Sequence, residues 1–449
     1  MTERAAGLRP GDVVDVEVGP IAHGGHCVAR HEGQVLFVRH TAPGERVRAV
    51  VTELGPGGKF VRADATDVLL ASPARVTPPC AYAARCGGCD FQHLTLDAQR
   101  DLKTAVVREQ FAHLARQDVD VTVAALPGSA TGLGWRTRVD YAVDADGRPG
   151  LRPHRSHAVL PIETCVLAAP GVADSEVLNR LWPGESAVDV VSPGAGAAVV
   201  VPIPSGVAGV ATVSEPVAAS WQSATAGPRH FSHDFTVSAR GFWQVHPAAA
   251  ATLLGAVLGG LDPRPGERAL DLYAGVGVFA AGLAAEVGPG GQVIAVESDA
   301  GALTSARANL DPWPWALLVP GRVEDAFGVT SRSRRGAGGR RGGARGPGGN
   351  SGGRIAGRSP LIPDAADLVV LDPPRSGAGR AVVEAVAGLR PRAVAYVACD
   401  PAALARDTAF LREVGYGLAE VTAYDAFPMT HHVECVAIFH PLDLVAKLS

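Results

Sequence analysis

The stretch ERALDLYAGVGVFA, residues 267–280, decides the fold of the C-terminal half of this 449-residue chain. An apolar run of strand length ends in a loop that contains Gly275 and Gly277, and an apolar helix pattern follows. Glycine lets the backbone approach a ligand, and the free N–H groups of a helix start attract anionic or polar groups. The next strand pattern ends about 20 residues later on an acid, Glu297, which is suited to bind ribose hydroxyls. The spacing predicts a nucleotide-type ligand at this loop.

The same loop leaves two cofactor classes open. Gly275, Gly277 and Ala280 satisfy the G-x-G-x-x-A spacing of dinucleotide-binding folds, which indicates NAD. S-adenosylmethionine is the alternative ligand for a strand, loop and helix of this kind. The choice between the two cofactors has to come from other parts of the chain.

From residue 241 onward, buried strand patterns alternate with amphipathic helix patterns. The strand patterns are ERALDLYAG, GQVIAVES, WALLVP, ADLVVLDPP and RAVAYVACD. This alternation predicts a doubly wound, Rossmann-like α/β domain that binds ligands at the carboxyl ends of its strands. Residues 331–358 interrupt the pattern with eight arginines and no acid. That composition predicts a disordered surface insertion, which we favour over an RNA-binding arm.

The N-terminal half has a different pattern of apolar and polar residues. Residues 8–66 alternate apolar and polar side chains in short runs separated by Gly or Pro, which predicts a small β-barrel. Residues 96–116 have the apolar spacing of one amphipathic helix, which we expect to pack on the C-terminal domain. The predicted domains are a barrel over 1–70, a β-rich central domain over 71–240 and the α/β domain over 241–449.

Charge and hydropathy give weaker indications. The net charge of −4 does not indicate a nucleic-acid binder, although phosphate contacts need only a local basic face. The N-terminus has no apolar core of signal-peptide length. The most apolar stretch, residues 194–213, is broken by Pro202, Pro204 and several glycines, so it is a poor membrane span. We expect a cytoplasmic monomer that does not contact a membrane.

The chain has seven cysteines, and three of them are bunched as Cys80-x5-Cys86-Gly-Gly-Cys89. With Cys165 far downstream, they offer four thiolates, which suit either zinc or an iron–sulfur cluster. Structural zinc sites usually have two short C-x2-C pairs, and this chain has one. The pattern therefore favours the cluster.

Two further strand ends carry chemistry. Asp372 is followed by two prolines, which fix a rigid exit from the sheet and hold the acid at the ligand edge. Cys399 is followed by Asp400 and Pro401, where a helix pattern begins. A strand-end cysteine is usually packing, but a helix start lowers the pKa of a thiol and favours the nucleophilic thiolate. An acid next to the thiol, here Asp400, has the opposite effect unless it is turned away or paired.

A thiolate that attacks carbon 6 of uracil converts carbon 5 into an enolate able to take a methyl group. Such an adduct needs a base to remove the carbon 5 proton, and Glu434 in PMTHHVECVAIF is the candidate. Its apolar neighbours raise the pKa of its carboxyl group. The alternative interpretation of Glu434 is a residue of an edge strand without a catalytic role. His431 and His432 are assigned no catalytic role.

In this order, these motifs resemble those of the RNA 5-methyluridine methyltransferases that carry an iron–sulfur cluster, over essentially the whole chain. The start resembles a TRAM domain, an OB-like RNA-binding barrel. CAYAARCGGCDFQH, residues 80–93, resembles the family's cluster motif. The resemblance implies a 4Fe-4S cluster on the following ligands: Cys80, Cys86, Cys89 and Cys165.

The remaining motifs resemble the family's cofactor and catalytic motifs. GFWQVHP resembles its Phe-x-Gln-Val-Asn stretch, DLYAGVGVFA its cofactor loop and LDPPRSG its strand-four motif. ACDPAALARD resembles the nucleophile motif and FPMTHHVE the base motif. The resemblance implies S-adenosylmethionine in place of NAD. The residues implied to bind it are Gln244, Tyr273, Gly275, Glu297 and Asp372, with Cys399 as nucleophile and Glu434 as base.

The chain departs from the family pattern at two notable positions. Asp400 stands where the nucleophile motif usually has Asn, and His246 stands where the glutamine motif usually ends in Asn. The implied substrate is a uridine in structured RNA, with 23S rRNA favoured over the T-loop of tRNA. A non-catalytic RNA-binding or assembly protein is the alternative from another class, and a radical enzyme that pairs a cluster with S-adenosylmethionine is a further one.

Overall fold

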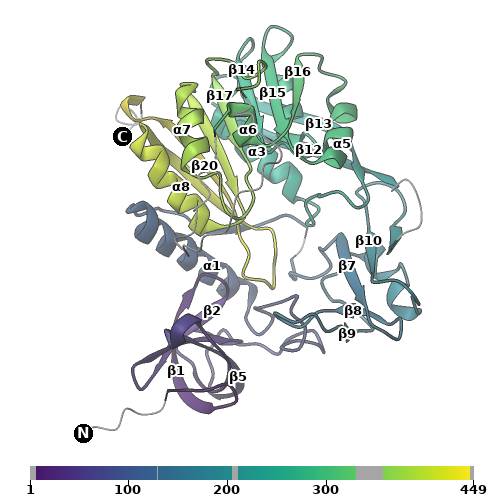
Figure 1. Ribbon diagram of the computed structural model, residues 1–449, viewed down its shortest axis with the longest axis vertical. Helices are drawn as coiled ribbons and strands as arrows, with labels where there is room; N and C mark the ends of the chain where they lie inside the picture. The colour runs from purple at the N-terminus through teal and green to yellow at the C-terminus, as the bar shows by residue number, and fades with distance from the viewer. Residues whose placement is uncertain (1–6, 129, 205–210, 330–356, 445–449) are drawn as a thin grey trace, which may run out of the picture.

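The computed structural model describes residues 7–128, 130–204, 211–329 and 357–444. Residues 331–356, most of the Arg/Gly insertion, lie outside these ranges. Figure 1 shows a barrel at one end of the molecule, an α/β domain at the other and a central sheet beside them. Within the described ranges, no helix combines the length and the apolar character that a membrane crossing needs.

The N-terminal strands close into the expected barrel. Its strands are β1 Val13–Ala22, β2 His26–His31, β3 Gln34–Arg39, β4 Arg46–Leu54 and β5 Val61–Leu70, in the order β1-β2-β3-β5-β4. Alternate side chains of β1 point inward, where Val14, Val16 and Val18 are buried. The two-residue period of a strand produces this alternation, and the predicted barrel is confirmed.

A helix joins the barrel to the α/β domain. Helix α1, Leu96–Gln110, begins at Thr95, whose hydroxyl accepts a hydrogen bond from the Ala98 amide, and it continues as a π-helical turn over Phe111–Ala115. Val106 belongs to the barrel core, whereas Val107 belongs to the core of the α/β domain. The helix therefore fixes the two parts to each other.

The central part contains a five-stranded sheet in the order β11-β10-β7-β8-β9. Its strands are β7 Arg138–Val143, β8 Pro149–Leu151, β9 Leu160–Pro161, β10 Ala187–Val191 and β11 Val199–Ile203, with the short helix α2 Pro170–Ala173 nearby. A long hairpin follows, β12 Thr212–Ser223 and β13 Gly227–Ser238. The inner face of the hairpin shares its core with α3 and α4, so this segment packs with the α/β domain although it precedes residue 241.

The C-terminal domain is an eight-stranded sheet in the order β16-β15-β14-β17-β18-β20-β19-β6. The strands are β14 Arg268–Leu272, β15 Gln292–Glu297, β16 Ala316–Pro320, β17 Leu368–Leu371, β18 Ala393–Ala398, β19 Tyr416–Asp425, β20 Glu434–Pro441 and the earlier β6 Val123–Ala125. The helices are α3 Ala249–Leu261, α4 Val278–Val287, α5 Ala300–Leu310, α6 Val323–Phe327, α7 Arg380–Gly388 and α8 Pro401–Glu413. One face packs on α3, α4 and the hairpin, and the other on α1, α6, α7 and α8. The doubly wound prediction is confirmed.

The chain order of the strands reverses beside β14. Strands β15 and β16 extend the sheet on one side of β14, and β17 and β18 extend it on the other. A crevice opens at the carboxyl ends of the strands at such a reversal, and ligands bind there. The loops that follow β14, β15, β17 and β18 therefore converge on one site.

Candidate active site

The sheet register brings Cys399 and Glu434 together. Strand β20 is antiparallel to β18, and Ala398 pairs with Cys435. The next pair in this register is Cys399 and Glu434, so their side chains leave the same face of the sheet side by side. The two predicted catalytic residues are 35 positions apart in the sequence and neighbours in the fold.

The cofactor loop has the strained backbone that its glycines suggested. Tyr273, Gly275 and Gly277 have positive φ angles of 69°, 55° and 92°. The Gly275 amide donates a hydrogen bond of 2.8 Å to the Glu297 carboxylate, whose other oxygen accepts from the Ser298 and Asp299 amides. These bonds hold the acid at the end of β15 against the glycine loop.

Asp271 lies beneath this loop and was not predicted as a site residue. It is fully buried, and its Oδ2 accepts a 2.8 Å hydrogen bond from the Ala280 amide at the start of α4. Its Oδ1 has no partner among the described residues. Burial raises the pKa of Asp271 to about 8. The carboxyl group thus supports the cofactor loop from the side of the sheet. Its position as the first residue of the DLYAG motif is the sequence feature that could have identified it.

One cavity of about 1110 Å³ contains all seven predicted cofactor and catalytic residues. They are Gln244, Tyr273, Gly275, Glu297, Asp372, Cys399 and Glu434. The cavity runs from the glycine loop to the ends of β17 and β18, which is the crevice that the strand order predicts. Several acidic groups face it, and a cationic ligand is favoured there because a positive charge stabilises ionised carboxylates and thiolates.

Burial controls the protonation of the catalytic groups. It raises the pKa of Asp372 to about 7 and holds the pKa of Glu434 well above its usual range. It also raises the pKa of Cys399 to about 11, and the neighbouring Glu434 adds to this effect. The helix start was expected to lower the pKa of the thiol, but burial and the carboxyl group outweigh it in the protein without ligands.

Arg375 opposes this effect. It follows the two prolines after Asp372, is exposed, and lines the same cavity. The positive charge of its guanidinium group lowers the pKa of the Cys399 thiol and also favours ionised Glu434. Arg375 belongs to the LDPPRSG motif, and its role was not predicted from the sequence.

Comparison with known proteins gives the family. A profile described as TRAM domain matches residues 8–66, and one described as tRNA (Uracil-5-)-methyltransferase matches residues 363–440. An "Uncharacterized RNA methyltransferase" of Streptomyces avermitilis is 44% identical over 96% of this chain and 99% of its own length. The 23S rRNA (uracil(1939)-C(5))-methyltransferase RlmD of Chromohalobacter salexigens is 31% identical over 97% of this chain and 91% of its own. The chain belongs to the RNA uracil-5-methyltransferase family.

A solved structure supports the fold. The Pyrococcus abyssi tRNA (uracil-54, C5)-methyltransferase in complex with S-adenosyl-L-homocysteine matches 94% of this chain and 100% of its own with a TM-score of 0.61. The two sequences are 21% identical, so the likeness concerns the fold. As a member of the RNA uracil-5-methyltransferase family, the protein is an enzyme that depends on S-adenosylmethionine.

The two departures from the family's motifs lie in different surroundings. His246 is buried away from the cavity, stacks on Trp135 at 5.9 Å and accepts a hydrogen bond from the Ala248 amide. Asp400 caps α8, because its Oδ1 accepts a 2.8 Å hydrogen bond from the Ala403 amide. Its Oδ2 lies 3.2 Å from Nε2 of His23 in the barrel. Asp400 is therefore paired.

The four cysteines of the central part are brought together. Thiolate charges at Cys80, Cys86 and Cys165 all raise the pKa of Cys89, although burial is the larger cause. Cys89 and Cys165 also pack on Trp135 and Met429. Among the described residues, no group of three or more His, Cys, Asp or Glu side chains is arranged to hold a metal ion.

Proposed function

We propose that this enzyme methylates carbon 5 of a specific uridine in 23S rRNA, with Cys399 as nucleophile and Glu434 as base. The observation that carries the proposal is the register of β18 and β20, which brings Cys399 opposite Glu434 in the cavity that also holds the glycine loop. RlmD enzymes, which share 30–31% identity with this chain over nearly its full length, support 23S rRNA as the substrate.

The chain's own residues perform most of the proposed reaction. The Cys399 thiolate forms a bond to carbon 6 of uracil, and the electrons of the 5,6 double bond move to carbon 5 and the O4 enolate. When bound, S-adenosylmethionine would supply an electrophilic methyl group, which carbon 5 takes while the cofactor's sulfur leaves as the neutral thioether of S-adenosylhomocysteine. The Glu434 carboxylate then takes the carbon 5 proton, the double bond forms again and the thiolate leaves carbon 6. The raised pKa of Glu434 makes its carboxylate a stronger base.

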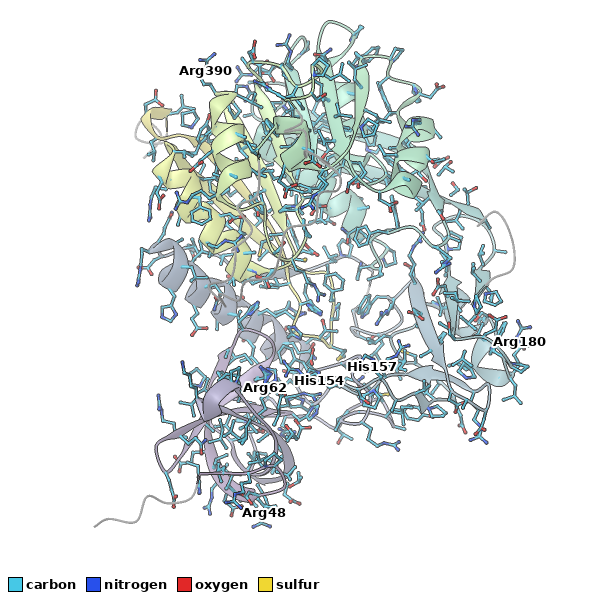
Figure 2. The ribbon with its side chains drawn as sticks, viewed as in Figure 1. Arg48, Arg62, His154, His157, Arg180 and Arg390 are labelled. Carbon is cyan, nitrogen blue, oxygen red and sulfur yellow. The ribbon has the colours of Figure 1, made fainter. Side chains whose placement is uncertain are left out.

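Two surface features support an RNA substrate. Phe242, at the cavity, is 77% exposed, and an exposed ring there offers a stacking surface for a base that has left its helix. Figure 2 shows Arg62 of the barrel close to His154 of the central part. Burial lowers the pKa of His26 to about 4, and Arg39 and Arg62 lower it further, so the positive charge that this region offers to phosphates is carried by its arginines.

We also propose that the four cysteines hold a 4Fe-4S cluster with a structural role. Four thiols are the donors that such clusters use, and bound iron would offset the mutual repulsion of their thiolate charges at Cys89. Directly after Cys89, the Asp90 and Phe91 amides both donate 2.9 Å hydrogen bonds to the Met429 carbonyl. The cluster would thereby hold the loop that leads to Glu434. Cluster removal under anaerobic conditions should loosen this loop and weaken RNA binding; lost methyl transfer with unchanged folding and RNA affinity would contradict a structural role.

The test is methylation of separate 23S rRNA and tRNA transcripts, with 5-methyluridine measured by mass spectrometry. We expect product in 23S rRNA and none with Cys399→Ala, in which turnover falls by at least about 10⁴-fold because the nucleophile is lost. Product in tRNA alone would favour the T-loop substrate. Unchanged methylation by Cys399→Ala would exclude the covalent scheme, and no product in either RNA would favour the non-catalytic alternative. A monomeric state and a cytoplasmic location stay predictions.

A further inference from the structure

The turn between β1 and β2 of the barrel reaches the catalytic loops. A Cβ atom at Gly25 would lie 2.8 Å from Cβ of His431, and the φ angle of Gly25 is +80°. Its neighbour His23 forms the 3.2 Å ion pair with Asp400, the residue directly after the nucleophile. The barrel therefore contacts the active site at two places. One is the nucleophile motif, and the other is the loop over residues 426–433 that leads to Glu434, called the base loop below.

A second cavity, of about 190 Å³, lies between this turn and Cys399. Its walls come from the barrel turn, α1, the start of α8 and the base loop. Three residues line both cavities, namely Arg375, Cys399 and His432. The barrel turn is thus one wall of a space that meets the methyl-transfer site at the nucleophile.

We propose that His23 is a positioning residue, which fixes the barrel to the nucleophile motif through its ion pair with Asp400. RNA bound by the barrel then enters the active site in one defined position. The inference rests on the proposed function. Asp400 has two roles here, since one oxygen caps α8 and the other binds His23. Asn at this position preserves the cap, because its side-chain oxygen also accepts from an amide, but it cannot form the ion pair.

The charges around the pair give it a defined pH dependence. Asp400 faces His23 directly, and Glu109 of α1 adds a second negative charge. The other ionisable groups of the second cavity have their own partners: Lys103 with Asp425, His431 with Asp90, and Cys399 with Arg375, whereas His432 is kept neutral by burial. Asp400 raises the pKa of His23, and the pKa of Asp400 itself is lowered, so the ion pair is present between these two pKa values and is lost as the pH rises through that of His23.

The experiment compares Asp400→Asn, His23→Gln and the double variant with the wild type. Each is expected to raise KM for RNA about 1.5- to 5-fold, the range for a partly exposed ion pair, with KM for S-adenosylmethionine unchanged. The double variant is expected to match the single ones, since both remove one interaction. In the wild type, KM for RNA should rise with pH, and in Asp400→Asn this rise should disappear.

Asp15→Asn is the matched control, because it breaks the 3.0 Å ion pair with Arg48, on the outer side of the same barrel (Figure 2). It should leave KM for RNA unchanged. Hydrogen exchange of residues 22–26 supplies a readout that needs no activity: exchange should quicken in Asp400→Asn and not in Asp15→Asn. Unchanged exchange, or a fall in kcat without a rise in KM, would overturn the positioning role. Absence of 5-methyluridine in the wild type would overturn the proposed function and leave the exchange result to decide the role of the pair.

Discussion

The active site has two halves, a cofactor half around the glycine loop and a nucleophile half around Cys399 and Glu434, and different kinds of contact hold them in place. In the cofactor half, the decisive hydrogen bonds span short distances in sequence: Ala280 to Asp271 across nine positions and Gly275 to Glu297 across 22. In the nucleophile half, the bonds span most of the chain. Asp90 binds His431 across 341 positions, and Lys103 binds Asp425 across 322.

This difference shows what the N-terminal domains contribute. The loop between β19 and β20, residues 426–433, has no regular structure of its own. Gln99 of α1 accepts from the Met429 amide at 2.9 Å, and Asp90 bonds both the amide and the ring of His431. The loop that leads to the base is therefore held in place by one residue of the cysteine motif and one residue of α1. We infer that the cofactor half tolerates damage to the N-terminal domains and the nucleophile half does not.

The strongest test of the nucleophile half is Glu434→Gln. The variant keeps the shape of the side chain but cannot take the carbon 5 proton, so turnover should fall about 10²- to 10⁴-fold. The methylated adduct should then accumulate as a protein–RNA complex that resists denaturant on a gel. Cys399→Ala/Glu434→Gln is the control and should form no such complex. A complex in that double variant would mean that another nucleophile is at work.

Lys103→Ala tests the contacts by which α1 holds the loop between β19 and β20. Lys103 and Asp425 are both buried at a distance of 2.5 Å, and Lys103 also donates to the Phe427 carbonyl. Removal of one partner leaves a buried unpaired charge, which should lower the free energy of unfolding by about 3–5 kcal/mol in denaturant titrations. Lys103→Met/Asp425→Leu removes both charges and should recover most of this loss. Equal losses in both variants would show that packing, and not the charge pair, matters.

Glu297→Gln tests the cofactor half. Loss of the charged acceptor should weaken S-adenosylmethionine binding about 10- to 100-fold, the value of a hydrogen bond to a charged group. Calorimetric titration measures this directly. RNA affinity should stay at the wild-type value, because the side chain of Glu297 bonds only within its own loop region. A large fall in RNA affinity would mean that the two halves are not separable.

The smallest expected effect concerns Arg375. The pKa of Cys399 is about 11, so the reactive thiolate is a minor form at neutral pH and kcat/KM should rise as the pH increases from 7 to 9. Arg375→Gln removes a cation that lowers this pKa and should reduce kcat/KM at pH 7 on the order of threefold, since solvent screens an exposed charge. Arg375→Lys should retain most of the activity. A flat pH profile in the wild type would show that thiolate formation does not limit the rate.

Sequence reasoning reached much of this site for a physical reason. Cys399 and Asp372 each follow a buried strand, and parallel strands end at one edge of the sheet, so periodicity predicts them at the same edge. Tyr273 was predicted from the resemblance to the family's cofactor loop. The roles of Asp271 and Arg375 were missed, because their importance depends on a buried orphan oxygen and on a contact with the thiol. The hairpin β12–β13 was grouped with the central domain, since its alternating pattern does not reveal which core its inner face joins.

By itself, the sequence determined the barrel, the doubly wound domain, the glycine loop and the catalytic motifs, because these depend on short-range periodicity and backbone freedom. The tertiary structure decided what lies opposite those motifs. It placed Glu434 beside Cys399 through an antiparallel register, raised the pKa of both by burial, and brought His23 to Asp400 from the other end of the chain. Register, burial and docking between domains are sums over many distant contacts, and no local stretch of sequence encodes them.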